Sequence, residues 1–271
     1  METKADGTHG EISRLEEGDA GVPSGQESKS RFGFCTSTSV ITMTQKVVAE
    51  VIGTFFVIFS GCGAVVVNKL YGGKITHPGV SATWGLTVMV MVYSVGHISG
   101  GHFNPAVTIC FAAFRQFPLW EVPFYIVAQL MGSIIASGTL ALMFSVTHEA
   151  FFGTVPAGSD AQSFVIEIVI SFLLMFVISG VSTENTAVGD LAGVAIGMTI
   201  MLNVLVAGPV SGASMNPARS IGPAIVKSVY KGLWVYILGP VIGTLAGRFA
   251  YNLIKLTDTP MRELTKSFSK V

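Results

Sequence analysis

The stretches SGGHFNPA at residues 99–106 and SGASMNPA at residues 211–218 end in the same tripeptide, and the expected fold follows from this repetition. In each stretch, small residues lead to an asparagine that is followed by proline and a short apolar segment. Proline fits the first turn of a helix, because the N–H group that it lacks would have no intrahelical partner there. The asparagine amide can cap that turn or hydrogen-bond a passing solute. Each copy therefore predicts a helix that begins directly after an asparagine.

The composition is typical of a protein that lies in a membrane. Of the 271 residues, 50% are hydrophobic and 12% are charged, whereas about 25% charged residues is usual in soluble domains. The 16 basic and 16 acidic residues cancel, so no overall charge favours a nucleic-acid partner. The cysteines Cys35, Cys62 and Cys110 have no metal-ligand spacing. We therefore expect no metal site, no cofactor and no nucleic-acid partner.

Six apolar stretches are long enough to cross a bilayer, which takes about 20 helical residues. They lie near residues 47–67, 81–98, 122–146, 162–181, 191–208 and 232–255. Two shorter apolar stretches, near 104–113 and 216–226, reach only about halfway across the hydrocarbon core. Each half of the chain has the order span, span, half-helix, span. The expected fold is an all-α membrane protein with six transmembrane helices and two re-entrant half-helices in an inverted repeat.

Three spans separate the two motifs, and this odd number places the half-helices on opposite faces of the membrane. Their N-terminal ends are expected to meet near the middle of the bilayer, at the interface of the repeats. Half-helices at that depth are tolerated only where they line a cavity or are covered by protein. Asn104-Pro105-Ala106 and Asn216-Pro217-Ala218 are therefore candidate pore motifs. The alternative is that both asparagines are plain helix caps without solute contact.

The chain divides into a membrane domain and two polar tails. Residues 1–42 are expected to form a disordered tail, residues 43–255 the six-span channel domain, and residues 256–271 a C-terminal tail. The repeat halves cover about 43–146 and 162–255. Six spans leave both termini on one side, and basic residues in the N-terminal tail favour the cytoplasm. The membrane itself, the plasma membrane or an endomembrane, stays open.

Two serines of the C-terminal tail, Ser267 and Ser269, lie beside Lys266 and Lys270. Phosphorylation by a protein kinase would add charge to a mobile tail, which could then act on the inner mouth. The alternative is that both serines are simply solvated.

Four residues are expected to share one layer in the outer half of the membrane. Arg219 lies one turn after Asn216, and a permanent charge in an apolar segment indicates function unless the side chain reaches the interface. Trp84 lies near the start of the second span and Val204 near the end of the fifth, while Ala213 belongs to the loop before the second half-helix. Trp84 could instead belong to the aromatic belt of the membrane surface.

Two carboxylates also lie in apolar stretches. Glu50 and Glu167 occur early in the first span of each half. A buried carboxylate needs donors, and a re-entrant loop has unpaired backbone N–H groups to offer. We therefore assign both residues a role in bracing the loops, with a proton relay as the alternative.

The two motifs, Arg219 and the six spans resemble the aquaporin family (major intrinsic proteins) over about residues 43–255. HISGGHFNPAVT at residues 97–108 and GPVSGASMNPARS at residues 208–220 resemble most closely the plant nodulin-26-like intrinsic proteins. The resemblance implies a homotetramer in which every subunit has its own pore. It also implies an outer aromatic/arginine filter of four residues, which the spacing to the motifs places at Trp84, Val204, Ala213 and Arg219.

Val204 stands where the water-specific members of this family carry a histidine. Valine removes a hydrogen-bond donor and widens the ring, which leaves an apolar wall opposed by Arg219. This departure favours passive permeation of small uncharged solutes such as glycerol, together with water. The resemblance adds uncharged metalloid acids and ammonia. Ions and protons should be excluded by Arg219, the apolar ring and the dipoles of the half-helices.

Other functions fit the sequence less well. A coupled secondary transporter would share the inverted repeat, but Glu50 and Glu167 are its only candidates for a titrating site. A membrane-embedded enzyme would need a nucleophile–base pair or a metal cluster, and the apolar spans have neither. A scaffold role leaves Arg219 without a purpose. The sequence therefore predicts a channel and no enzymatic activity.

Overall fold

A computed structural model describes residues 33–145, 150–182 and 189–255. Helices account for nearly all the regular structure in this part of the chain, which contains no β-strand, and the all-α prediction is confirmed. The α-helices are α1 (Gly33–Leu70), α2 (Thr76–Ser99), α3 (Pro105–Ala113), α4 (Val122–Met143), α5 (Asp160–Ser182), α6 (Ala192–Ser211), α7 (Pro217–Lys227) and α8 (Val235–Lys255). Short 3-10 turns, η1 (Leu119–Glu121) and η2 (Gly189–Leu191), precede α4 and α6.

Six of the helices in the described ranges are long and apolar enough to cross a membrane. These are α1, α2, α4, α5, α6 and α8, whereas α3 and α7 have 9 and 11 residues. The order in each half is thus long, long, short, long, as the sequence predicted. The expected spans are all found, and apart from the start of the first span their ends differ by at most five residues.

The N-terminal boundary differs from the prediction. Helix α1 begins at Gly33, so the structure continues the helix through residues 33–42, which the sequence assigned to the tail. These residues include no charged side chain and no proline, and a helix that has already formed extends at little cost. Residues 1–32 and 256–271, with Ser267 and Ser269, lie outside the described residues.

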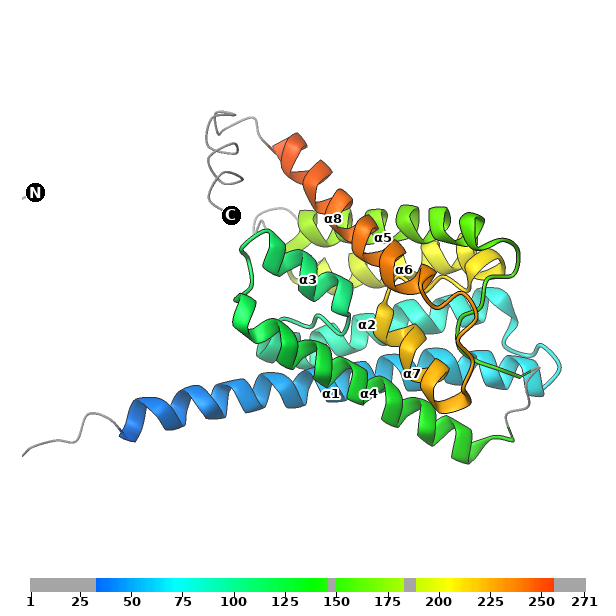
Figure 1. The fold of residues 1–271 in the computed structure, drawn as a ribbon, viewed down its shortest axis with the longest axis horizontal. Coiled ribbons are helices and arrows are strands. Elements are labelled where there is room, and N and C mark those ends of the chain that lie inside the picture. The colour runs from blue at the N-terminus through cyan, green and yellow to red at the C-terminus, as the bar shows by residue number, and fades with distance from the viewer. Residues whose placement is uncertain (1–32, 146–149, 183–188, 256–271) are drawn as a thin grey trace, which may run out of the picture.

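The helices pack as two similar sets that meet at the centre (Figure 1). Helix α1 packs against α4 in the first half, α5 packs against α8 in the second, and α2 packs against α6 between the halves. A Cβ atom on Gly197 of α6 would lie 2.6 Å from the Gly85 carbonyl oxygen of α2. The two helices therefore touch backbone to backbone, the close approach that small residues permit in membrane bundles.

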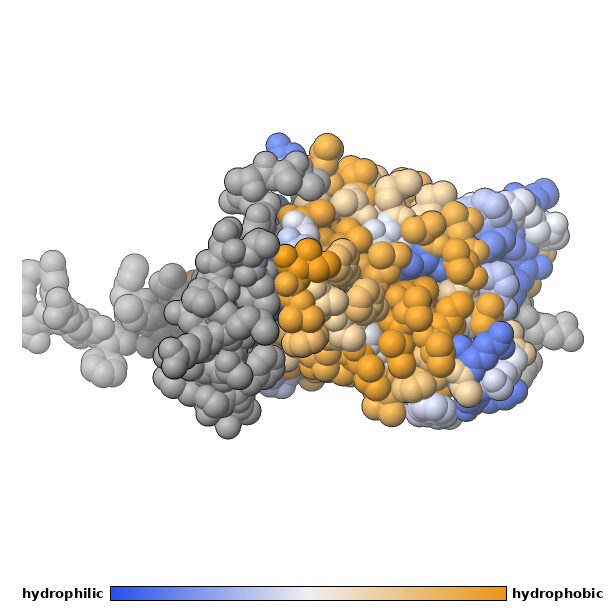
Figure 2. All heavy atoms as spheres, turned by 90° about the horizontal axis from the view of Figure 1, so that it is seen from above, coloured by the Kyte–Doolittle hydropathy of each residue, from blue (hydrophilic) through white to orange (hydrophobic). Residues whose placement is uncertain are grey.

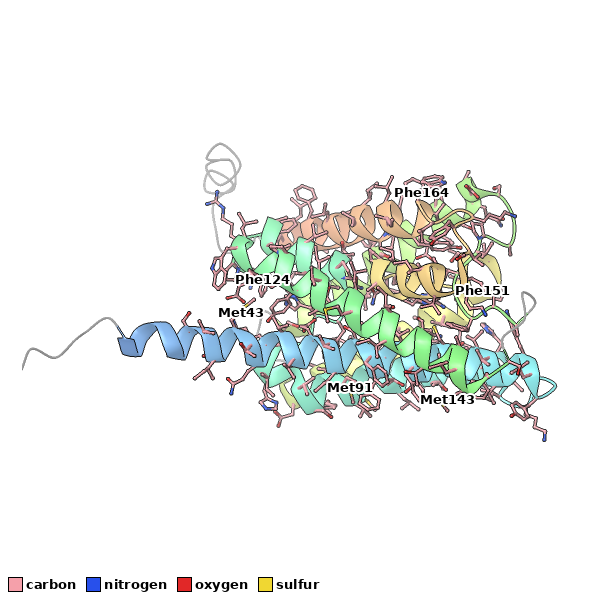
Figure 3. All side chains as sticks on the ribbon, turned by 60° about the horizontal axis from the view of Figure 1, so that its bottom comes forward. Met43, Met91, Phe124, Met143, Phe151 and Phe164 are labelled. Carbon is pink, nitrogen blue, oxygen red and sulfur yellow. The ribbon has the colours of Figure 1, made fainter. Side chains whose placement is uncertain are left out.

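The outer surface between the two ends is apolar. Figure 2 shows hydrophobic residues over the middle of the molecule, whereas hydrophilic residues gather at the end that is not covered by grey atoms. The side chains of Phe124 and Met143 project away from the bundle (Figure 3), and they are 52% and 59% exposed. A surface of this kind suits contact with lipid chains.

Candidate functional site

Helices α3 and α7 begin side by side in the middle of the molecule and run toward opposite ends (Figure 1). Hydrogen bonds cross between the two motifs at this point. Asn104 Nδ2 donates to the Met215 carbonyl oxygen at 2.8 Å, and Asn216 Nδ2 donates to the Phe103 carbonyl oxygen at 2.8 Å. Each asparagine is therefore held by the loop of the opposite half.

Each asparagine also caps its own helix. Asn104 Oδ1 accepts a hydrogen bond from Ala106 N, and Asn216 Oδ1 accepts one from Ala218 N, both at 2.9 Å. A carboxamide nitrogen has two hydrogens, so one N–H of each side chain remains beyond the crossed bond. Both asparagines line the same cavity. Capping and contact with a solute are therefore compatible roles for the same side chain.

The loops that lead into the two half-helices follow the same backbone path. The φ angle is 90° at Gly100 and 85° at Gly212, and it is 48° at Phe103 and 54° at Met215. Glycine adopts this left-handed region freely, but phenylalanine and methionine do so only where their surroundings hold them. Each loop therefore needs strong anchoring from the rest of the fold.

Glu50 anchors the first loop. The side chain is fully buried, and its two carboxylate oxygens accept hydrogen bonds from both the loop backbone and neighbouring side chains. The donors are Ser99 Oγ at 2.7 Å, His102 N at 2.9 Å, Phe103 N at 2.7 Å and Gln129 Nε2 at 2.8 Å. Four donors at these distances stabilise a buried carboxylate and fix the loop in place.

Glu167 anchors the second loop in the same way. It is also fully buried, and it accepts hydrogen bonds from Ser211 Oγ at 2.6 Å, Ser214 N at 2.8 Å and Met215 N at 2.8 Å. The two carboxylates therefore hold equivalent loop positions, which is the geometry expected of braces.

A tyrosine supports each loop as well, and the sequence analysis missed this pair. Tyr125 OH donates to the Ser99 carbonyl oxygen at 2.6 Å, and Tyr236 OH donates to the Ser211 carbonyl oxygen at 2.8 Å. Both tyrosines are fully buried. Their separation in the chain is close to that of the two motifs, and this spacing is the signal that could have found them.

Replacing Glu167 with glutamine should destabilise the fold by about 3 kcal/mol, because an amide N–H₂ would then face the N–H donors of the loop. The midpoint of thermal unfolding in detergent measures the effect. Asp190→Asn is the matched control, since Asp190 is an exposed carboxylate. Equal midpoints for the two variants would contradict the bracing role.

A cavity of about 150 Å³ extends from the motifs into the space between the long helices. Much of its wall comes from residues at four-residue spacing, which lie on one face of a helix. These wall residues are Trp84, Val88 and Val92 of α2, Leu174, Ile178 and Ser182 of α5, and Ala192, Ile196, Ile200 and Val204 of α6. The wall is mainly apolar, and Asn104 and Asn216 bring amides into it.

A second cavity of about 270 Å³ lies at the other side of Trp84. Its lining includes Asn68, Lys69 and His77, and the segment 153–157 closes part of it. Lys69 Nζ donates to the Phe151 carbonyl oxygen at 2.6 Å, and Figure 3 shows Phe151 beside α7. These residues could not be found from the sequence, because nothing in their spacing marks them as neighbours.

The two cavities meet at one level. Trp84, Val204 and Arg219 line both of them, while Ala213 lines the first. These are the four residues that the sequence placed in one layer, and the structure brings them together. Exposures of 4% or less put all four inside the protein and off its outer surface.

Arg219 has a specific environment at this level. Its Cζ atom lies 4.6 Å from the centroid of the Trp84 ring, a cation–π distance. Its Nη2 donates to the Gly212 carbonyl oxygen at 3.0 Å. Nε and Nη1 are buried and have no hydrogen-bond partner within the described residues. Arg219 lines both cavities, so its guanidinium is the charged group that a polar molecule there would meet.

Comparisons with known proteins show the family of this chain. A family model described as "Major intrinsic protein" matches residues 37–251. A protein of Nicotiana alata described as "Probable aquaporin NIP-type" is 67% identical over 261 residues, which cover 96% of this chain and 96% of that protein. Nodulin-26 of Glycine max is 58% identical over 229 residues, which cover 84% of each chain.

Among solved structures, the aquaglyceroporin from Plasmodium falciparum has a TM-score of 0.69 and 23% sequence identity. The match covers 79% of this chain and 100% of that one. At this identity the likeness concerns the fold alone.

Proposed function

The chain belongs to the major intrinsic protein family, and on this premise we propose that it is a passive channel for glycerol and similar small uncharged solutes, and for water. Members of this family are multi-pass membrane channels and not enzymes. The proposal rests on one observation. Trp84, Val204 and Arg219 line both cavities, so the two cavities meet at these side chains.

Glycerol suits the chemistry of this level. One edge of a glycerol molecule presents C–H groups, which would slide along Trp84 and Val204. The opposite edge presents hydroxyl groups, which would accept hydrogen bonds from the guanidinium of Arg219. A valine in place of a larger, polar side chain leaves room for the carbon chain and keeps the wall apolar. Water, which is smaller, would pass as well.

The paired asparagines would form a second solute-binding position in the pore. Asn104 and Asn216 lie at the N-terminal ends of α3 and α7, where free N–H groups and the helix dipoles disfavour cations. Their remaining amide hydrogens would hydrogen-bond a solute in transit, with Pro105-Ala106 and Pro217-Ala218 setting the first turns. Together with the charge of Arg219, this arrangement would exclude cations and protons.

Four finer points of the proposal follow from the family and the sequence. We propose that uncharged metalloid acids and ammonia are further solutes, and that the protein is a homotetramer with one pore in each subunit. Both termini would lie in the cytoplasm, in the plasma membrane or an endomembrane. Ser267 and Ser269 would be the substrates of a protein kinase.

Stopped-flow swelling of proteoliposomes with solutes of increasing width tests the proposal. We expect water and glycerol to enter much faster than into empty vesicles, and wider polyols to enter no faster. Val204→Trp provides a control in which the shared level is filled. Permeabilities that do not depend on solute width, or that match empty vesicles for glycerol, would contradict the proposal.

A further inference from the structure

We propose that Gly61 of α1 is a positioning residue that sets the width of the level lined by Trp84, Val204 and Arg219. Because Gly61 has no side chain, the Trp84 indole would pack flat against the α1 backbone. The inference rests on the proposed function of this level as the filter of the pore. It adds a determinant of selectivity that itself lines neither cavity among the described residues.

The indole lies directly on Gly61. A Cβ atom added to Gly61 would lie 2.5 Å from Trp84 Cε2, whereas nonbonded carbon atoms prefer about 3.5–4.0 Å. Both residues are buried, and the two helices α1 and α2 pack against each other here. The ring therefore occupies the volume that any side chain at position 61 would need.

The position of Gly61 along α1 matches the narrow level. Val57, four residues earlier, lines the first cavity, and Val65, four residues later, lines the second. Residues at this spacing share one face of a helix. Gly61 lies between these two valines on the same face of α1. At this position α1 has no side chain, and the Trp84 indole covers its backbone. The indole thus forms the wall where α1 would otherwise do so.

Arg219 stacks on the same indole, with its Cζ atom 4.6 Å from the ring centroid. We infer that the guanidinium lies across the ring from Gly61, because Gly61 already fills the space over its own face of the ring. A side chain at Gly61 would push the ring by about 1 Å, the difference between the built and the preferred contact. The direction left to it leads toward Arg219 and the lumen. The filter would become narrower, and the stacking on the guanidinium would change.

Gly61→Ala should therefore lower the ratio of glycerol to water permeability by about tenfold, because a narrower passage raises the barrier for the wider solute more than the barrier for water. Gly63→Ala is the matched control on the same helix. A Cβ atom on Gly63 would lie 3.5 Å from Leu140 Cδ2, an ordinary contact. The ratio should stay at the wild-type value in this variant.

A second pair of variants separates positioning from a general effect on the fold. In Trp84→Ala the indole is absent. Adding Gly61→Ala to this variant should therefore leave the glycerol-to-water permeability ratio at the value of Trp84→Ala alone. The double variant also keeps the test available if Gly61→Ala alone fails to fold. Without the indole, the alanine Cβ at position 61 has nothing to clash with. Folding of the double variant together with failure of the single one would support the same contact.

The outcomes distinguish the inference from the function on which it rests. Wild-type vesicles that pass glycerol no faster than empty ones would contradict the proposed function, and the inference with it. Wild-type vesicles that pass glycerol, with equal ratios for Gly61→Ala and Gly63→Ala, would contradict the inference alone. The inference would also be contradicted if Gly61→Ala lowered the glycerol-to-water permeability ratio equally in the wild-type and the Trp84→Ala backgrounds.

Discussion

Val204→His should slow glycerol at least about tenfold, while water permeability stays within about twofold of the wild-type value. Val204 is 3% exposed and lines both cavities, so an imidazole at this position would enter the level opposite Arg219. The larger ring would narrow the passage for a carbon chain. The ring nitrogens of histidine would hydrogen-bond water, and water is small enough to pass the narrower opening.

Stopped-flow measurement of both solutes on the same vesicle preparation gives the comparison. Val206→His is the control, because Val206 lies on the same helix and is 63% exposed on the outer surface. Its glycerol-to-water ratio should not change. An equal loss of glycerol and water flux in Val204→His would count against the assignment of Val204 to the filter.

Arg219→Met should raise the leak of protons and small cations by at least about a hundredfold. Arg219 is 4% exposed, and it places a permanent charge where the two cavities meet. At about 4 Å and an effective dielectric constant of about 20, a single charge repels a cation by about 4 kcal/mol, which exceeds the barrier change needed for this leak. Methionine keeps the length of the side chain and removes the charge.

A pH-sensitive dye inside the vesicles, with an imposed potassium gradient, reports this leak. Arg248→Met is the matched control, since Arg248 is also 4% exposed but lies on α8, and it is not among the residues that line either cavity. A leak that is the same in both variants would assign ion exclusion to something other than Arg219.

Much of the fold could be predicted from the sequence because the decisive signals are local. A proline directly after an asparagine specifies the start of a helix, and an apolar run specifies its length. Both signals occur in the same order in each half, which predicts the repeat, and the odd number of spans between the motifs predicts its inversion. The start of α1 at Gly33 was missed, because a short uncharged segment beside a span is compatible with either a tail or a helix.

The contacts that shape the site could not be predicted in the same way. The bond from Asn104 Nδ2 to the Met215 carbonyl oxygen joins residues far apart in the chain, and no spacing rule names a backbone acceptor. The placement of Trp84 against Gly61 depends on the crossing of two helices. Depth along the membrane normal could group the four residues of the filter layer, because depth follows from position in a span. Distances within that layer required the packed structure.

We propose that neutral molecules pass this channel without coupling to any gradient, and glycerol uptake at equilibrium is the sharpest test of this proposal. Radiolabelled glycerol uptake into wild-type proteoliposomes can be followed to equilibrium with and without an imposed proton gradient. We expect glycerol to enter rapidly and to reach the same concentration inside and outside, whatever the gradient. Accumulation of glycerol above the outside concentration when protons flow inward would contradict it, and would make the buried carboxylates Glu50 and Glu167 parts of a transporter.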